Sequence, residues 1–301
     1  MKPKFVEIIV TIADCGSIGA AATQLGKSQP AITNALRKAE DELGERVFHR
    51  VPHGIIPTDL GVVVIERCRR ISREMQQMDE ELAQLKGDFT GTINIVAATI
   101  AAVQILPKVL KQFRRQHPKI RVNVSSGKMS VAYQSLLAGD IDFVVGPAPS
   151  QTRGGGLRSV PILESQIVVV TGANSRFIGV SDPAELKQGN WLVNGPVEHR
   201  PRYYSFFEAH GETPPDPAIS ADSIVAILSM VEDSDNLCCV PRELLEYLKG
   251  SREFASLPLG DQIGTATIFL TSAIDRSFTP AAILFADILQ QHSEVKNETH
   301  N

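Results

Sequence analysis

The sequence predicts an α+β chain of three successive parts: a small helical unit with a hairpin, one long helix, and two α/β lobes. Three observations predict it. Glycines separate short amphipathic segments near the N-terminus, apolar residues then repeat every three or four positions, and strand-like and helical segments finally alternate. The expected boundaries are 1–59, 60–91 and 92–301, with one lobe at about 92–163 plus 268–292 and the other at about 164–267.

The composition is that of a folded globular chain, since 43% of the 301 residues are hydrophobic and 21% are charged. No apolar run reaches the roughly 18 residues that a membrane span needs. Glu7 and Asp14 interrupt the apolar stretch near the N-terminus, so no signal peptide is indicated. We therefore expect a cytoplasmic protein without a membrane partner.

The first two expected helices are short. Apolar residues from Phe5 to Ile12 recur at helical spacing, and Gly16 ends that segment. A second helix over about 18–25 is made of small apolar residues and is closed by Gly26. The small residues let the next helix pack closely.

The third expected helix runs from the capping residue Ser28 to Gly44, with Pro30 in its first turn. Two helices joined by so tight a turn are typical of a helix-turn-helix, whose second helix presents its N-terminal end to the DNA major groove. Polar residues of this helix point away from the small core. We predict that it contacts double-stranded DNA through Ser28, Gln29, Pro30, Thr33, Asn34, Arg37 and Lys38.

A hairpin containing Gly54 follows and resembles the wing of such a unit. Arg50, His53 and Thr58 are the candidates for phosphate contacts beside the groove. Residues 1–58 hold seven Lys/Arg and six Asp/Glu, so DNA binding must depend on where the charges lie and not on their sum. The alternative is an ordinary three-helix packing unit with solvated polar side chains.

The long helix over about 60–86 carries an apolar stripe with heptad spacing, made of Val64, Cys68, Ile71, Met75, Met78, Leu82 and Leu85. So narrow a stripe favours pairing with another helix and predicts a homo-oligomer, whereas a long surface helix of a monomer is the alternative. Residues 87–91 contain two glycines and indicate a hinge.

Strands and helices alternate after residue 92. Strands are expected at 92–98, 120–125, 141–146, 167–171, 191–193, 218–220, 237–240 and 265–271, and helices at 101–117, 131–138, 201–210, 224–232 and 280–291. Successive strand–helix–strand steps imply parallel strands with right-handed crossovers. About 200 residues of this kind predict two lobes facing one another across a cleft.

The segment from Ala20 to Gly61 resembles the signature of the LysR family of bacterial transcription regulators. The resemblance is carried by Ala20, Ala21, Leu25, Gly26, Ser28–Thr33, Ala35, Arg37, Glu40, Glu42–Gly44, Phe48–Arg50, Thr58 and Gly61. It implies a winged helix-turn-helix, a dimerising linker helix and a two-lobed effector domain resembling periplasmic binding proteins. Asn34, Val47 and Pro57 depart from the residues usual in the family and leave the contacts of the wing open.

Ligands of open α/β lobes bind beyond the carboxyl ends of the strands. This rule and the resemblance select Thr99, Ile100, Lys128, Met129, Ser130 and Pro147 on the first lobe and Asn194 on the second, with His199, Arg202 and Tyr203 closing the opposite side. Helix N-termini at Thr99 and Ser130, with Lys128 beside them, favour an anionic organic effector. The alternative for Lys128 and Arg202 is simple exposure to solvent.

We expect a transcription regulator, not an enzyme, because the sequence contains no catalytic, nucleotide-binding or metal-binding motif and implies no cofactor. The resemblance implies a dimer or tetramer on an interrupted palindrome, with RNA polymerase as a further partner. Cys238 and Cys239 are expected in a buried strand, and a thiol-switched regulator is the alternative. A small-molecule-binding protein or an enzyme built on the α/β lobes is a less favoured alternative.

Overall fold

The computed structural model describes residues 2–52, 54–149, 155–195, 200–250 and 253–293. The chain forms two compact units, Met1–Asp88 with Ala138–Asp140, and Phe89–Leu137 with Ile141–Asn301. Each is described by itself below. The division after Asp88 falls inside the segment for which the sequence indicates a hinge.

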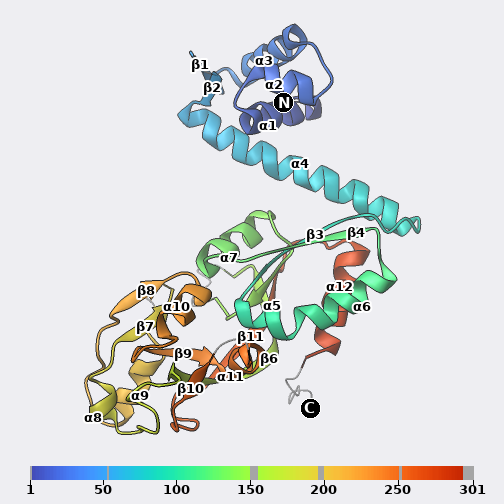
Figure 1. Ribbon diagram of the computed structural model, residues 1–301. Helices are drawn as coiled ribbons and strands as arrows, with labels where there is room; N and C mark the ends of the chain where they lie inside the picture. Colours follow the sequence, from blue (N-terminus) through green and yellow to red (C-terminus); the bar gives the residue numbers. More distant parts are fainter. Residues whose placement is uncertain (1, 53, 150–154, 196–199, 251–252, 294–301) are drawn as a thin grey trace. The chain divides into compact units, whose positions relative to one another are not determined.

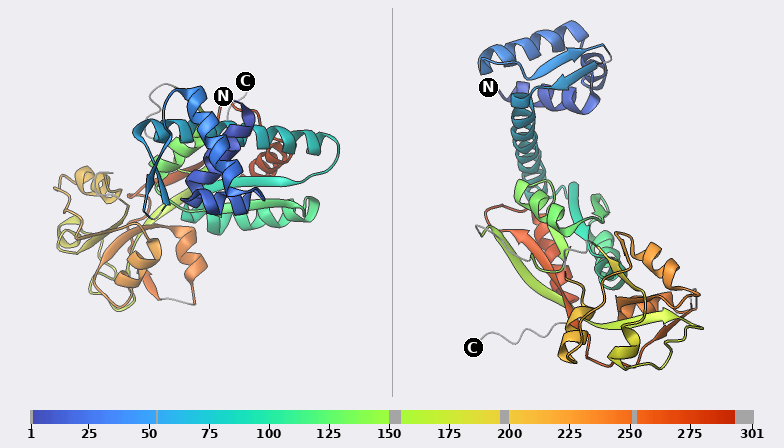
Figure 2. Two further views of the ribbon diagram at one scale, coloured as in Figure 1. Left: turned by 90° about the horizontal axis from the view of Figure 1, so that it is seen from above. Right: turned by 90° about the vertical axis from the view of Figure 1, so that its left-hand side faces the viewer.

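The N-terminal unit is a winged helix-turn-helix, as predicted (Figures 1 and 2). Its elements are α1 (Pro3–Cys15), α2 (Ile18–Gln24), α3 (Gln29–Leu43), β1 (Phe48–Val51) and β2 (Gly54–Pro57). Ser17 Oγ accepts from Ala20 N and Ser28 Oγ from Ala31 N, so both helices begin at a capping serine. Ile9, Ile12 and Ile32 are fully buried between the three helices.

The hairpin is held against the helices by backbone contacts that leave no room for side chains. Ile55 N donates to Gly16 O at 3.0 Å, and a Cβ on Gly54 would lie 2.5 Å from the same oxygen. The Glu40 carboxylate accepts from Val47 N at 2.8 Å. Glu40 therefore fixes the start of the hairpin, while the nearby Asp41, Glu42 and Glu45 are exposed at the surface.

Helix α4 (Asp59–Leu85) follows the hairpin and has two different halves. In the first half, Ile65 and Cys68 are buried in the core of the N-terminal unit. The prediction that Cys68 belongs to an oligomer stripe is therefore wrong, because this position packs within its own chain. In the second half five apolar residues are exposed: Ile71, Met75, Met78, Leu82 and Leu85.

The second unit, Phe89–Leu137 with Ile141–Asn301, is the predicted effector unit and begins with three parallel strands in the order β4-β3-β5 (Figure 1). They are β3 (Gly91–Ala97), β4 (Ile120–Ser125) and β5 (Phe143–Gly146), with α5 (Thr99–Gln104), α6 (Leu106–Gln116), α7 (Met129–Ala138) and α12 (Pro280–Gln291) around them. Helices α6 and α12 lie side by side, and Phe113 meets Phe285 edge to face at 5.3 Å (Figures 1 and 2).

The second lobe is built on the strand order β6-β9-β7-β8, with β10 on the other side of β6. Its elements are α8 (Pro183–Leu186), β7 (Trp191–Asn194), α9 (Tyr203–Ala209), β8 (Ile219–Ala221), α10 (Ile224–Val231), β9 (Leu237–Pro241), α11 (Arg242–Leu248) and β10 (Phe254–Ser256). Aromatic side chains fill its core, where Trp191 stacks on Tyr203 with ring centroids 4.2 Å apart.

Two long antiparallel strands run through both lobes: β6 (Leu157–Gly172) and β11 (Thr265–Ala273). Their register shifts between Ile268 and Phe269, which marks a β-bulge within the first lobe. The sequence predicts only the apolar end of β6. Its first half mixes polar residues with Pro161, which does not show the pattern of a strand.

The predicted single helix over 101–117 is wrong, because the chain forms α5 and α6 with a break at Ile105. Pro107 stands at the second position of α6, where its missing N–H is tolerated, but it cannot continue a helix from α5. Helices α8 and α11 and strand β10 were not expected at all. They are only three to seven residues long, and such lengths carry little periodicity.

Among the described residues, no single helix is long and apolar enough to cross a membrane. Helices α1 and α2 reach that length and apolarity only together, and they are bent by 118° at the break between them.

Candidate DNA-binding surface and effector loops

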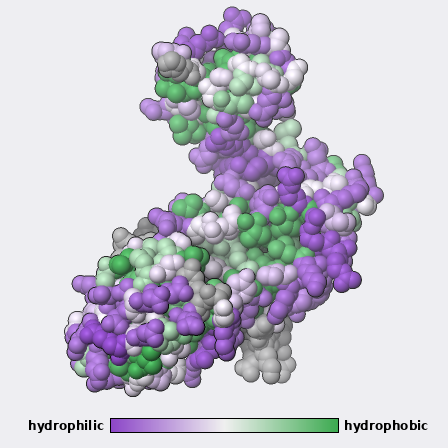
Figure 3. All heavy atoms as spheres, in the orientation of Figure 1, coloured by the Kyte–Doolittle hydropathy of each residue, from purple (hydrophilic) through white to green (hydrophobic). Residues whose placement is uncertain are grey.

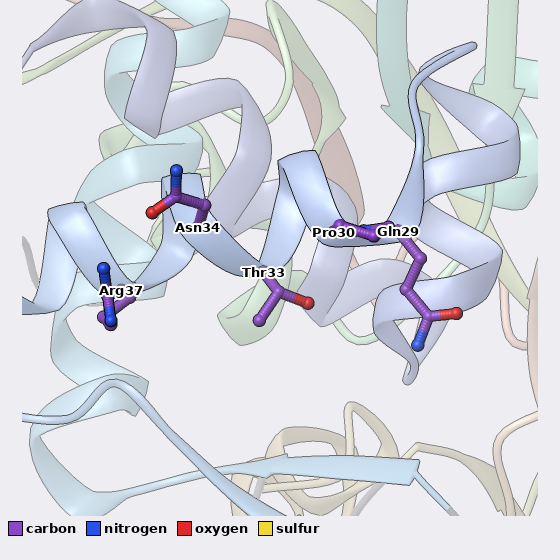
Figure 4. A pocket seen from close by; sticks show the side chains of 5 residues that line it. All are labelled: Gln29, Pro30, Thr33, Asn34 and Arg37. Atoms are coloured by element: carbon purple, nitrogen blue, oxygen red, sulfur yellow. The ribbon is translucent and has the colours of Figure 1, made fainter.

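Helix α3 separates a buried face from an exposed polar face. Ile32, Leu36 and Ala39 are buried against α1 and α2. Gln29, Thr33 and Arg37 are four residues apart, and Figure 4 shows their side chains on one side of the helix. Together with Pro30 and Asn34, they line an open hollow of about 460 Å³.

Asn34 lines the same hollow as the other predicted contacts of α3. Its side chain points in a different direction from those of Gln29, Thr33 and Arg37 in Figure 4, because one residue beyond Thr33 is a rotation of about 100° around the helix. Lys38 is exposed in the next turn, and Ser28 is engaged as the cap of the helix. The aligned side chains of Gln29, Thr33 and Arg37 are therefore the most suitable for reading base edges.

The wing residues have different surroundings. Arg50 is exposed on β1, and His53 lies outside the described residues. Thr58 Oγ1 donates to Arg46 O at 2.8 Å and accepts from Gly61 N at 2.8 Å. Thr58 is thus the cap of α4, and its phosphate contact stays a prediction.

The first lobe brings its predicted effector residues together at one edge of the sheet. Ala98 N donates to Val145 O at 2.8 Å, so the ends of β3 and β5 are adjacent. A Cβ on Gly146 would lie 2.8 Å from Met129 Sδ and 3.7 Å from Ala98 Cβ. The neighbours of these residues, Thr99, Lys128, Ser130 and Pro147, are all exposed at this edge.

The prediction that the Ile100 side chain contacts an effector is wrong, because it is 5% exposed and belongs to the core of the first lobe. Only its backbone is in a position to meet a ligand. The sequence signal for this placement is the helical spacing from Ile100 to the buried residues of α5 and α6.

The first part of this unit has a strong charge asymmetry. Residues 89–139 contain no Asp or Glu but carry Lys108, Lys111, Arg114, Arg115, Lys119, Arg121 and Lys128. Since the whole chain has a formal charge of −4, this part of the first lobe differs in sign from the rest. Such a surface attracts anions.

A second hollow, of about 540 Å³, lies on the first lobe near the amino end of β4. Leu110 and Val122 contribute apolar walls, and Arg114, Lys119 and Arg121 contribute cations. Figure 3 shows hydrophobic side chains gathered on this unit in the region where Figure 1 draws β3, β4 and α5. Because it lies at the opposite end of β4, this hollow is separate from the effector loops.

The second lobe holds Asn194 exposed at the end of β7, and Gly195 N donates to Ala221 O at 2.8 Å. Arg202 is exposed, and its Nη1 donates to Thr265 O at 2.9 Å, which ties α9 to the start of β11. His199 lies outside the described residues.

The prediction that Tyr203 contacts the effector is wrong. Tyr203 is 1% exposed, its ring stacks on Trp191, and its hydroxyl donates to Pro215 O at 3.0 Å. Burial raises the pKa of the hydroxyl. This residue is part of the aromatic core that holds α9.

A residue that the sequence analysis missed is Tyr133 on α7. Tyr133 is 9% exposed, and its hydroxyl donates to Pro147 O. Burial raises the pKa of Tyr133 to about 12. The sequence signal for its burial is the helical spacing of Ala132, Tyr133 and Leu136 in α7.

The two adjacent cysteines point to opposite faces of β9 and pack against different parts of the second lobe. Burial raises the pKa of Cys239 to about 12 and raises that of Cys238, which is 1% exposed, well above its ordinary value. Neither offers the thiolate that rapid oxidation needs. Among the described residues, no group of three or more His, Cys, Asp or Glu side chains is placed to hold a metal ion.

The fold and this surface define a winged helix-turn-helix protein joined to a two-lobed ligand-binding domain. Residues 4–62 match the family described as bacterial regulatory helix-turn-helix protein, lysR family, and residues 86–294 match the LysR substrate binding domain. The chain belongs to the LysR family. It is a DNA-binding transcription regulator whose activity responds to a small-molecule effector.

Similar proteins extend over nearly the whole chain. The transcriptional regulator GalR of Pseudomonas putida is 25% identical over 95% of this chain and 72% of its own length. TdcA of Escherichia coli is 23% identical over 97% of this chain and 94% of its own length. The named relatives are transcriptional regulators.

Solved structures have the same fold. Full-length CbnR complexed with its target DNA has a TM-score of 0.72, with 19% identity over 97% of this chain and all of the other. Full-length OxyR from Pseudomonas aeruginosa has a TM-score of 0.68, with 18% identity over 97% of this chain and 94% of the other.

Proposed function

We propose that Gln29, Thr33 and Arg37 read the operator sequence. The observation that carries this proposal is the alignment of the three polar side chains along the exposed face of α3 (Figure 4). Gln pairs with adenine and Arg with guanine through two hydrogen bonds each, and one such pair is worth about 1–3 kcal/mol of discrimination. Lys38 and Arg50 contribute phosphate contacts that position the unit.

The near-neutral charge of residues 1–58 makes these few contacts decisive. A single unit of this kind has little non-specific attraction for DNA. Two copies bound to two half-sites multiply the effect of each contact, so we propose a homodimer or homotetramer on an interrupted palindrome. The similarity in fold to CbnR, which was solved with its target DNA, supports this reading.

The exposed apolar residues in the second half of α4 supply a surface for this association. Ile71, Met75, Met78, Leu82 and Leu85 are between 42% and 70% exposed in the single chain. A stripe of five large apolar side chains on one helix is stabilised by pairing with another helix. The surface begins after Cys68, because the earlier positions pack on the core of the N-terminal unit.

We propose an anionic organic molecule as the effector. It would meet the exposed loops at Thr99, Lys128–Ser130 and Pro147, with Asn194 and Arg202 on the second lobe. Lys128, which is exposed in the loop before α7, and the absence of Asp and Glu from residues 89–139 support an anion. The effector shifts regulation only if it binds one arrangement of the regulator more tightly than another.

This function places the protein with chromosomal DNA in the cytoplasm, with RNA polymerase as its further partner and no enzymatic step of its own. The thiol-switched alternative is less favoured, because burial keeps Cys238 and Cys239 protonated.

The DNA proposal is tested by selection of bound fragments from a random DNA pool with the full chain. We expect an interrupted palindrome to be enriched. Selection with Gln29→Ala should relax one base position in each half-site and leave the spacing unchanged. Enrichment of the same bases by the variant would contradict the assignment of α3.

The effector proposal is tested by thermal unfolding in the presence of small carboxylates, sulfonates and matched neutral amides. A rise in melting temperature is expected with at least one anion and with none of the amides. Lys128→Gln should reduce that rise. A response only to neutral compounds would contradict an anionic effector.

A further inference from the structure

The Glu40 side chain joins the DNA-reading helix α3 to the start of the wing hairpin. One carboxylate oxygen, Oε1, accepts from Val47 N at 2.8 Å and from Phe48 N at 3.3 Å. The backbone oxygen of Glu40 accepts from Gly44 N at 2.8 Å, at the glycine that ends α3. A single residue of α3 therefore closes the helix and holds the first residues of the hairpin.

The segment that Glu40 holds also carries the end of the hairpin and the start of α4. Val47 is fully buried, and its carbonyl oxygen accepts from Thr58 N at 2.9 Å. Thr58 Oγ1 caps α4, and a Cβ on Gly61 would overlap the carbonyl oxygen of Val47. Both ends of the hairpin and the first turn of α4 thus form one assembly, and Glu40 attaches this assembly to α3.

The hairpin has a second attachment, at its other end. Ile55 N donates to Gly16 O at 3.0 Å, and Gly16 lies between α1 and α2. Phe48 and Ile55 are buried in the core that the three helices share. Of the two hydrogen-bonded attachments, only that of Glu40 involves the DNA-reading helix.

Arg50, the exposed cation of the wing, lies far enough from this attachment to respond strongly to its loss. It stands three residues after Val47, about 10 Å along the chain, since a strand rises about 3.3 Å per residue. A rotation of about 10° at Val47 would move it by about 2 Å. Binding groups must be held within about 0.5 Å of their working position. The wing can therefore meet a phosphate reliably only if its start is fixed.

We propose that Glu40 is a positioning residue for DNA binding, which holds the wing in the orientation that meets the phosphate backbone while α3 lies in the major groove. The inference rests on the proposed phosphate contact of the wing, for which Arg50 is the candidate. Glu40 acts through its acceptor oxygen, because a negative charge contributes nothing favourable to binding a polyanion. A glutamine side chain also has such an oxygen.

The experiment measures the affinity of the full chain for a duplex of the selected operator at several salt concentrations. Loss of one phosphate contact lowers the slope of log affinity against log salt by about 0.9. Arg50→Ala and Glu40→Ala should each lower the slope by about this amount for every bound copy and weaken binding at 0.1 M salt by about tenfold per copy. Glu40→Gln should restore the slope and the affinity.

The double variant tests whether the two residues serve the same contact. If Glu40 acts by positioning Arg50, the affinity of Glu40→Ala with Arg50→Ala equals that of Arg50→Ala alone, because the contact can be lost only once. A residue that only stabilises the fold would weaken binding without changing the slope, and its effect would add to that of Arg50→Ala.

Two control variants separate positioning from a loss of stability or of charge. Thr11→Val removes a side-chain hydrogen bond within α1, from Thr11 Oγ1 to Glu7 O at 2.8 Å. Asp41→Ala removes a carboxylate that is exposed on α3 next to Glu40. Neither should lower the salt slope. Hydrogen exchange over residues 46–51 should rise in Glu40→Ala and stay unchanged over residues 5–36, which shows that the helices remain folded.

A wild-type salt slope in Glu40→Ala, failure of Glu40→Gln to restore the slope, or full additivity with Arg50→Ala would overturn the positioning role. If Glu40→Ala lowers the slope while Arg50→Ala keeps it, the phosphate contact of Arg50 is wrong, and Glu40 positions the wing for another residue. The failure of one proposal is thus distinguishable from the failure of the other.

Discussion

The N-terminal unit and the effector unit place their functional side chains in opposite ways. The N-terminal unit presents Gln29, Thr33 and Arg37 on one helix, at a spacing that the sequence displays directly. The effector unit gathers Ala98, Met129 and Gly146 from separate strand and helix ends. A site on a single helix follows from periodicity, whereas a site assembled from several segments depends on tertiary contacts that no local pattern contains.

The strongest test of the compactness of the N-terminal unit is Gly61→Val. A Cβ at Gly61 would lie well inside van der Waals distance of the Val47 carbonyl, and backbone cannot move away cheaply. We expect a loss of more than about 4 kcal/mol in the unfolding free energy of this unit and no operator binding. Hydrogen exchange over residues 4–58 measures the first effect.

Gly127→Ala is the matched control in the effector unit, because nothing lies within 4 Å of a Cβ at that position. It should change the unfolding free energy by less than about 0.5 kcal/mol. Gly61→Val with unaltered exchange over 4–58 would show that the hairpin and α4 pack more loosely than described.

The next largest effect is expected on association. Met75→Asp combined with Leu82→Asp places two charges on the exposed apolar face of α4, so sedimentation should show monomers where the wild type forms dimers or tetramers. Glu74→Gln, at an exposed position beside that stripe, is the control and should leave the association unchanged. If the double variant still forms oligomers, the interface does not lie on this face of α4.

A smaller effect is expected from Ser28→Ala, which removes the cap of α3. Ser28 Oγ accepts from Ala31 N, and loss of such a cap costs about 1 kcal/mol. Thermal unfolding should register this loss, and operator affinity should fall only modestly because Gln29 and Arg37 remain. A variant as stable as the wild type would show that the N-terminal end of α3 does not depend on this hydrogen bond.

The smallest effect is expected on the cysteines of β9. The folded pKa of Cys239 is about 12, above its ordinary value of 9.0, so the buried thiol stabilises the fold below about pH 9 and this contribution is lost as the pH rises toward 12. At pH 8 Cys238, which is buried, and Cys239, which is partly exposed like Cys15 but has the raised pKa, should therefore react with alkylating agents and mild peroxide more slowly than Cys15. Rapid oxidation of Cys239 would revive the thiol-switched alternative.

The architecture was largely predictable because helix-ending glycines and the spacing of apolar residues are features of the local sequence. Gly16 and Gly44 adopt the left-handed conformation that ends α1 and α3, and the apolar run of Trp191–Val193 forms β7. The first half of β6 was not predictable, since its pairing with β11 stabilises a segment with mixed polarity around Pro161.

The residues of α3 that face DNA could be predicted from the sequence more completely than the residues of the effector unit. The α3 contacts required only a helix with one buried face. Tyr203 and Cys68 were misassigned because each lies at a position where the sequence allows either a surface or a core role, and packing against Trp191 or α1 decides between them. Tyr133 was missed because no pattern in the sequence links it to Pro147, whose carbonyl accepts from its hydroxyl.

The central claim is that the face of α3 formed by Gln29, Thr33 and Arg37 reads DNA. Fluorescence anisotropy on the selected operator, at fixed salt, tests it most directly. We expect Arg37→Ala to weaken binding about 5- to 150-fold, corresponding to about 1–3 kcal/mol, and Asp41→Asn, at an exposed site near the other end of the helix, to have no such effect. If Arg37→Ala and the wild type prefer the operator over random DNA by the same ratio of affinities, the account is contradicted.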